Sequence, residues 1–203
     1  MSGRIKRSNP KIKLNASNYR KKSLPYLKRD FECRCAYSMI HMDNAGGERC
    51  MEVDHFKPQS NRSRKPHVYS NLMLASRHCN GAKGDEWPSK KMKKQGFEFI
   101  DPCKEQDYGK HIFEDISSGK LVAVSPKGCY QIEKCDLNAD HLVKQRLQRT
   151  KLRKLLEKGK SIFTIPENQP ILESNKFLGE MKESIENIKS NCIPYIPPPP
   201  INL

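Results

Sequence analysis

The chain has 203 residues, a length that fits one domain or one small domain with appendages. Its 38 Lys and Arg residues outnumber the 23 Asp and Glu residues, and only 35% of the chain is hydrophobic. We therefore expect a modest core and a polyanionic partner, with nucleic acid favoured over an acidic protein. No apolar run reaches the ~20 residues that span a bilayer, and the basic N-terminus lacks the apolar stretch of a secretory leader. These features predict a cytoplasmic protein whose cysteines are mostly reduced.

The first 30 residues carry ten Lys or Arg residues and a single acid, Asp30. Charge of one sign with few apolar anchors predicts a mobile basic arm, which either follows a phosphate backbone or only aids solubility. The composition then changes, because four of the eight cysteines and four of the six histidines lie between Phe31 and Asp85. This density of coordinating side chains marks residues 31–90 as the core of the candidate site.

Two strands and a helix are predicted inside this core. Residues 52–58 have strand character, and residues 69–74 form a second short apolar strand. Residues 78–83 are expected to be helical, which places two polar side chains three residues apart on the same side. The order strand, loop, strand, helix would bring the polar residues of the first strand next to those of the helix.

Residues 91–190 are predicted to be an extension that ends in helices, followed by a Pro-rich tail over residues 191–203. Helical spacing of leucines begins near Asp140, the expected N-cap, and Gly159 is the expected end of that helix. A further helix is expected over residues 171–188. Short strands or extended loops are expected at residues 97–100, 120–124 and 130–132. The small strands and the helices together predict an α+β fold.

Five polar residues of the core suit the hydrolysis of a phosphodiester. Asp54 and Asn80 offer the carboxylate and amide oxygens that a hard divalent cation prefers. His55 has a side chain that titrates near neutral pH, so it could deprotonate a water molecule as a general base. Asn71 could orient that imidazole or brace the loop by hydrogen bonds, and Lys83 could contact the scissile phosphate as a point charge.

The same positions resemble the signature of HNH nucleases. Asp54 and His55 match the first part of that signature, Asn71 the second, and Asn80 with Lys83 the third, in the variant whose third letter is Asn. The resemblance implies a small ββα-metal core and an endonuclease that hydrolyses nucleic acid with one divalent cation, Mg²⁺ or Mn²⁺. It implies catalytic roles for His55, Asn71 and Lys83, and metal ligation by Asp54 and Asn80.

The segment from residue 35 to residue 83 also resembles HNH proteins that hold a structural zinc with two pairs of cysteines. Here the sequence reads Cys35-Ala-Tyr-Ser38 and Ser76-Arg-His-Cys79, so each pair has one serine. Cys35 and Cys79 remain as residual zinc ligands, but serine is a poor one. Another side chain could complete the set, or packing and hydrogen bonds could replace the zinc, and we favour the second alternative. The substitute ligands would be Cys33, His41, Cys50 or His78.

Scattered residues further along resemble the downstream pattern of PtuB-like HNH proteins, which belong to Septu and retron systems of bacterial antiphage defence. This resemblance covers about residues 31–150. It implies an effector subunit that assembles with an ABC-type ATPase (PtuA-like), with a retron reverse transcriptase and its msDNA as further partners. The matching residues are Ile100-Asp-Pro102, Gly119-Lys-Leu121, Cys135-Asp-Leu-Asn138, Leu142 and Arg146.

The sequence also allows other interpretations. The incomplete cysteine set also fits a non-catalytic nucleic-acid-binding or adaptor subunit on a degenerate HNH scaffold. A third alternative is a zinc-containing structural protein of a ribonucleoprotein, but it needs tightly held zinc, and the incomplete cysteine set argues against it. The loop over residues 59–68 offers Arg62, Arg64 and Lys65 as nucleic-acid contacts, with solvated charge as the alternative, and its His67 is expected to be solvated. Phosphate contacts and a single metal serve DNA and RNA alike, so the sequence does not select between them.

Overall fold

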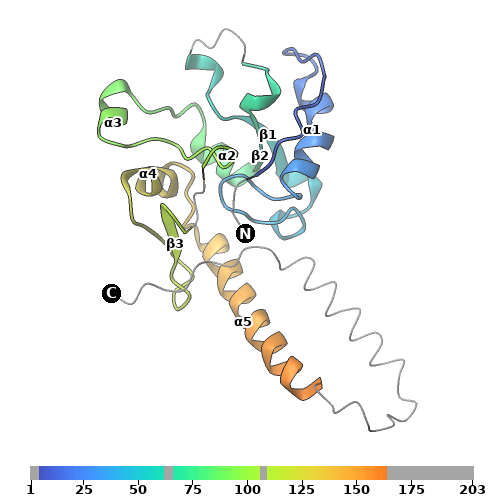
Figure 1. Cartoon of the computed structure of the whole chain (residues 1–203), viewed down its shortest axis with the longest axis vertical. Helices are drawn as coiled ribbons and strands as arrows, with labels where there is room; N and C mark the ends of the chain where they lie inside the picture. Colours follow the sequence, from blue (N-terminus) through green and yellow to red (C-terminus); the bar gives the residue numbers. More distant parts are fainter. Residues whose placement is uncertain (1–4, 62–65, 106–108, 164–203) are drawn as a thin grey trace, which may run out of the picture.

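A computed structural model describes residues 5–61, 66–105 and 109–163 of the chain (Figure 1). Two small antiparallel sheets, each of two strands, lie in different halves of the sequence, and helices pack around them. The fold is therefore α+β, as the sequence predicts.

The first sheet and the helix after it position the candidate site. Strand β1 (Met51–His55) pairs antiparallel with β2 (Leu72–Ser76). Helix α2 (Arg77–Lys83) begins directly after β2, because the hydroxyl of Ser76 accepts a hydrogen bond from the backbone N–H of Cys79 and caps the first turn. The predicted order of strand, loop, strand and helix is confirmed, although both strands occupy slightly different residues. Single 3₁₀ turns occur at Asp43–Ala45, Glu48–Cys50, Gln59–Asn61 and Tyr69–Asn71.

Helix α1 (Tyr19–Asp30) packs against this sheet (Figure 1). Its buried residues Tyr19, Ser23 and Leu27 recur every four positions, so they form one stripe that faces the core. The prediction of a mobile arm is therefore wrong for residues 5–30. A stripe only three residues long is enough to attach a helix whose other side chains are mostly basic.

The segment before α1 is also attached to the rest of the chain. The backbone N–H of Ile5 donates to the carbonyl of Pro102 at 2.9 Å. The guanidinium of Arg7 donates to the carbonyl of Tyr69 at 2.9 Å and lies 5.6 Å from the ring centroid of Phe31. The described N-terminal residues thus bridge the first sheet and the C-terminal half.

The second sheet consists of β3 (Ile112–Glu114) and β4 (Leu121–Ala123), which pair antiparallel, and helix α4 (Pro126–Lys134) packs against it. The contact between helix and strand is close at Gly128. A Cβ atom at this position would lie 2.0 Å from the carbonyl oxygen of His111, so only glycine fits there.

The three predicted extended segments have different outcomes. The strand expected at residues 120–124 is confirmed by β4. Residues 97–100 form no strand and are a loop, the other form that was expected there, whereas residues 130–132 lie inside α4, so the prediction for that segment is wrong. The side chain of Ser125 caps α4 and Pro126 occupies its first turn, which is the local signal that starts a helix there.

Two further helices complete the described chain. Helix α3 (Lys90–Lys94) is a short, Lys-rich turn, and α5 (Asp140–Phe163) extends away from the rest of the molecule (Figure 1). Helix α5 begins where it was predicted, but it continues past Gly159, so the prediction that this glycine ends it is wrong. The helix expected at residues 171–188 and the tail at residues 191–203 lie outside the described residues.

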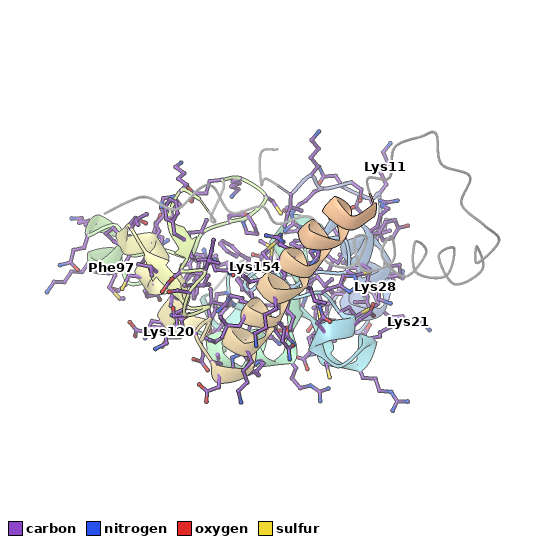
Figure 2. The ribbon with its side chains drawn as sticks, turned by 90° about the horizontal axis from the view of Figure 1, so that it is seen from below. Lys11, Lys21, Lys28, Phe97, Lys120 and Lys154 are labelled. Atoms are coloured by element: carbon purple, nitrogen blue, oxygen red, sulfur yellow. The ribbon has the colours of Figure 1, made fainter. Side chains whose placement is uncertain are left out.

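Basic side chains are spread over several faces of the molecule. In Figure 2, Lys21 and Lys28 lie on α1, whereas Lys120 lies on the other side of the view, next to the second sheet, and Lys154 lies on α5. None of the helices in the described part of the chain combines the length and apolarity that a membrane crossing needs.

Candidate active site

A cavity of about 370 Å³ opens between the end of β1, the start of the following loop, α2 and the first residues of α1. Asp54 and His55 line it from β1, and Asn80 lines it from α2. The proposed metal ligands and the proposed base, which are 26 residues apart in the sequence, therefore share one cavity. The remaining lining residues are Tyr19, Arg20, Val53, Pro58, Gln59, Ser60, Gly84 and Asp85.

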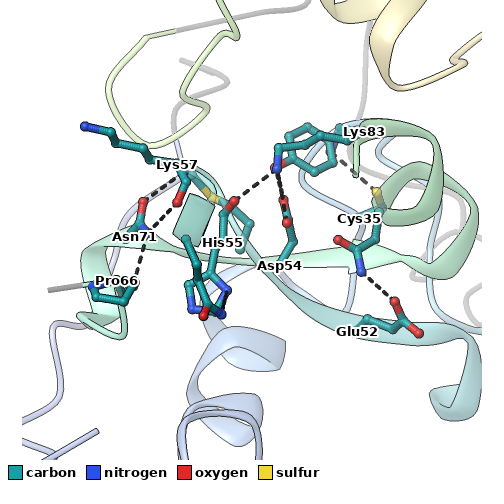
Figure 3. A network of polar contacts seen from close by, with 12 residues as sticks. Cys35, Glu52, Asp54, His55, Lys57, Pro66, Asn71 and Lys83 are labelled. Carbon is teal, nitrogen blue, oxygen red and sulfur yellow. Dashed lines mark hydrogen bonds and ion pairs between the residues drawn. The ribbon is translucent and has the colours of Figure 1, made fainter. Parts of the chain in front are cut away.

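Asp54 is buried and held by two hydrogen-bond donors. The hydroxyl of Tyr37 donates to its Oδ2, and the Nζ of Lys83 donates to its Oδ1 at 3.1 Å (Figure 3). Burial raises the pKa of Asp54, while the positive charge of Lys83 and the Tyr37 hydroxyl oppose that rise. The carboxylate consequently has a fixed orientation at the cavity wall.

Lys83 has a different position from the one that its predicted role requires. Its side chain has 0% exposure, and its Nζ donates to Asp54 and, at 3.0 Å, to the backbone carbonyl of His55 (Figure 3). A fully buried ammonium in these contacts cannot reach a phosphate in the cavity. The prediction that Lys83 contacts the scissile phosphate is therefore wrong. In the structure Lys83 orients the carboxylate of Asp54.

His55 is buried, and both of its ring nitrogens have a neighbour. Nε2 lies 3.1 Å from Nδ1 of His67, and Nδ1 lies 3.3 Å from the side-chain amide nitrogen of Gln59. Burial, followed by the neighbouring His67 and the cations Lys83 and Arg20, lowers the pKa of His55 to about 4. The imidazole is thus uncharged at neutral pH, which is the state that a general base needs.

Tyr19 and His67 contact the ring of His55, and neither contact was predicted from the sequence. The ring of His67 stacks on Tyr19 with centroids 4.8 Å apart, and Tyr19 also lies 4.8 Å from the His55 ring. His67 is half-buried here, so the expectation that it is solvated is wrong. Neither residue has a spacing in the sequence that would connect it with His55.

Asn71 braces the loop between the two strands. Its Oδ1 accepts from the backbone N–H of Lys57 at 2.9 Å, and its Nδ2 donates to the carbonyls of Lys57 and Pro66, both at 3.1 Å (Figure 3). Of the two roles that the sequence left open, the structure shows the bracing of the loop. The side chain makes no hydrogen bond to His55 among the described residues.

The donor atoms at the cavity suit one hard cation with few protein ligands. The Asp54 carboxylate keeps lone pairs beyond those that Tyr37 and Lys83 use. Asn80 donates through Nδ2 to Glu52 at 2.6 Å, and its Oδ1 accepts no hydrogen bond within the described residues. The described chain contains no group of three or more His, Cys, Asp or Glu side chains that could hold a metal, so water and phosphate would supply the other ligands, as Mg²⁺ prefers.

The four positions of the predicted zinc site also converge. Cys35, Ser38, Ser76 and Cys79 are all buried, and the two thiols hydrogen-bond to each other and to the serine side chains. The hydrogen bond to Cys35 and the burial of the thiol raise the pKa of Cys79 well above its usual range. Both cysteines are free thiols.

Other predicted contacts lie elsewhere. Arg62, Arg64 and Lys65 are outside the described residues. His78 does not line the cavity, and its Nε2 lies 3.1 Å from the carbonyl oxygen of Asp136.

Comparison with known proteins gives a match over the part of the chain that contains most of the cavity residues. No curated protein matches the sequence. One family model matches, and the matched segment contains β1, β2 and α2, which supply Asp54, His55 and Asn80. The model of the HNH endonuclease family matches residues 34–86, about a quarter of the chain.

Proposed function

We propose that this protein is a metal-dependent endonuclease that hydrolyses phosphodiester bonds of nucleic acid. The observation that carries the proposal is the convergence of Asp54, His55 and Asn80 on one cavity, inside the segment that matches HNH endonucleases. The surplus of basic residues supports a polyanionic substrate.

The residues at the cavity divide the work between them. Asp54 and Asn80 would hold one divalent cation, Mg²⁺ or Mn²⁺, which when bound would neutralise charge on the phosphate and stabilise the departing oxygen. His55, uncharged at neutral pH, takes a proton from the attacking water. The amide nitrogen of Gln59 can only donate, so the hydrogen bond to Nδ1 places the ring proton on Nε2. Nδ1 then takes the proton of the attacking water once that water replaces the Gln59 amide at this nitrogen.

The direct test compares the wild type with His55→Ala on duplex DNA, single-stranded DNA and structured RNA. We expect cleavage with Mg²⁺ or Mn²⁺, none in a chelator, and a loss of about 100-fold or more in the variant. His141→Ala is the matched control, because this imidazole is exposed and does not line the cavity. Equal cleavage by the wild type and His55→Ala would show that His55 is not the base.

A non-catalytic nucleic-acid-binding subunit is the second candidate. The ion pair between Lys83 and Asp54 favours it, because the lysine neutralises the carboxylate that would otherwise attract a cation. This alternative predicts salt-sensitive binding without cleavage under any divalent ion. The same substrate panel, extended with a filter-binding or fluorescence-polarisation assay, distinguishes the two candidate functions.

We further propose that the nuclease is the effector of an antiphage system of the Septu or retron type and assembles with an ABC-type ATPase. The support is the resemblance of scattered residues between positions 100 and 146 to PtuB-like proteins. Co-expression with a PtuA-like ABC-type ATPase, followed by size-exclusion chromatography, tests this assembly. Separate elution of the two chains, with unchanged cleavage, would contradict it.

A further inference from the structure

A positive side chain in the cavity would help the cation to bind a phosphate, and Lys83 does not supply one because it is fully buried against Asp54. Among the described residues that line the cavity, Arg20 is the one Lys or Arg side chain. None of the lysines labelled in Figure 2 lines the cavity, although Lys21 and Lys28 lie on α1 together with Arg20.

Arg20 is held next to the proposed base by its neighbour in α1. Its Nε donates to the hydroxyl of Tyr19 at 3.0 Å, and its guanidinium carbon lies 5.7 Å from the Tyr19 ring centroid. Tyr19 is itself buried against the rings of His55 and His67. Because Tyr19 is fixed in the wall of the cavity, its hydroxyl orients the guanidinium of Arg20.

The two terminal nitrogens of Arg20 are available for a ligand. Within the described residues, the only hydrogen-bond partner of the guanidinium is the Tyr19 hydroxyl, and the side chain is exposed at the cavity. A planar guanidinium with two parallel N–H groups matches the oxygens of a phosphodiester, and a lysine ammonium does not reproduce that match.

We infer that Arg20 is the phosphate-binding residue of this site and that its terminal nitrogens contact the nucleic-acid backbone in the cavity shared by Asp54, His55 and Asn80. The inference rests on the proposed nuclease function and adds to it a residue from outside the segment that matches the HNH family. Helix α1 is then part of the substrate site as well as a cover for the sheet.

The test compares Arg20→Ala and Arg20→Lys with Lys21→Ala. The control removes the same charge from the next residue of α1, which is exposed and does not line the cavity. Two substrates are used: the nucleic acid that is cleaved best, and bis(4-nitrophenyl) phosphate, which is small enough to report only on the cavity. Melting temperatures of all variants verify that the fold is retained.

We expect Arg20→Ala to lower kcat/KM on both substrates by about tenfold or more, because it loses a charge-assisted hydrogen bond. Arg20→Lys should recover only part of this loss, and Lys21→Ala should leave the small diester unaffected. If Arg20→Ala hydrolyses the small diester as well as the wild type does, the inference is overturned.

A failure of the proposed function is distinguishable from a failure of this inference. If the wild type cleaves neither substrate, the nuclease proposal fails, and binding of a fluorescent oligonucleotide in EDTA decides the role of Arg20. A larger loss of affinity in Arg20→Ala than in Lys21→Ala then supports the phosphate contact. Equal losses overturn it, because they show only the general effect of removing one charge.

Discussion

Lys83 forms a buried ion pair with Asp54, one of the two proposed metal ligands. Taking both charges out of water costs free energy, which their mutual attraction and the hydrogen bonds from Lys83 to Asp54 and to the His55 carbonyl offset. Removal of the lysine alone would leave a buried carboxylate with only the Tyr37 hydroxyl as a donor. A residue in this position supports the fold as well as the site.

Lys83→Met should therefore reduce the free energy of unfolding by about 3–5 kcal/mol. Urea denaturation measures this change, and Lys22→Met, which removes an exposed lysine from α1, is the matched control with an expected change near zero. The double variant Asp54→Asn/Lys83→Met should regain part of the lost stability, because no charge remains buried. If Lys83→Met is as stable as the control, the lysine does not hold Asp54.

The residues that could be predicted from the sequence are those with a recognisable spacing. Asp54, His55 and Asn80 were named from their order and chemistry, and the structure brings them to one cavity. Tyr19 and His67 were missed, because they reach His55 only through the packing of α1 and the path of a loop. Such contacts between distant segments leave no periodic or local signal.

The two Cys and Ser pairs lie in separate segments, one before β1 and the other at the junction of β2 and α2. The backbone N–H of Ala36 donates to the carbonyl of Leu74 at 2.7 Å, so the first segment is held directly against β2. The thiols and hydroxyls meet in this junction, where hydrogen bonds connect them. The arrangement has four converging side chains, of which two are poor metal ligands.

The variant Ser38→Cys/Ser76→Cys should consequently bind one zinc ion and melt at a higher temperature than the wild type. Four thiolates at these positions complete the tetrahedral set that structural zinc requires. Zinc content after dialysis and melting with and without a chelator provide the measurement, and the Ser38→Cys single variant is the control. The absence of retained zinc in the double variant would show that the four side chains do not converge closely enough.

The helices show where sequence patterns were sufficient and where they were not. Helix α2 was predicted from the three-residue spacing of two polar side chains, and the start of α5 from Asp140 as its N-cap and from the regular spacing of leucines. Helix α1 was missed because one of its three buried positions is a serine and Pro25 lies inside it. In α4 the apolar residues at positions 130 and 132 suggested a period of two, but the Ser125 cap and Pro126 determine the helix.

Asp30, at the end of α1, connects three parts of the molecule. Its Oδ2 accepts from the backbone N–H of Ser8 at 2.8 Å, from the Ser8 hydroxyl at 2.9 Å and from the Tyr69 hydroxyl at 2.7 Å. Burial opposes ionisation, but these hydrogen bonds outweigh it and lower the pKa of Asp30 below its ordinary value of 3.8. The ionised carboxylate therefore stabilises the folded state, and this contribution is lost as the pH falls through the folded-state pKa.

Asp30→Asn should lower the melting temperature at pH 7 by about 2–4 °C, the shift expected for the loss of about one charged hydrogen bond in a chain of this size. The difference between variant and wild type should narrow below about pH 4, where the wild-type carboxylate becomes protonated as well. Thermal melts by circular dichroism between pH 3 and pH 7 measure both effects. A difference that stays constant over this range would contradict the role of the charge.

The borders of the family match also have a practical consequence for the design of a shorter fragment that keeps the candidate site. The matched segment begins at residue 34 and leaves out α1. A fragment trimmed to those borders would lack Tyr19 and Arg20 from the wall of the cavity, and it would leave uncovered the apolar surface on which Leu27 and Phe31 are buried. A fragment that keeps the whole cavity must therefore include α1, which lies upstream of the first matched residue.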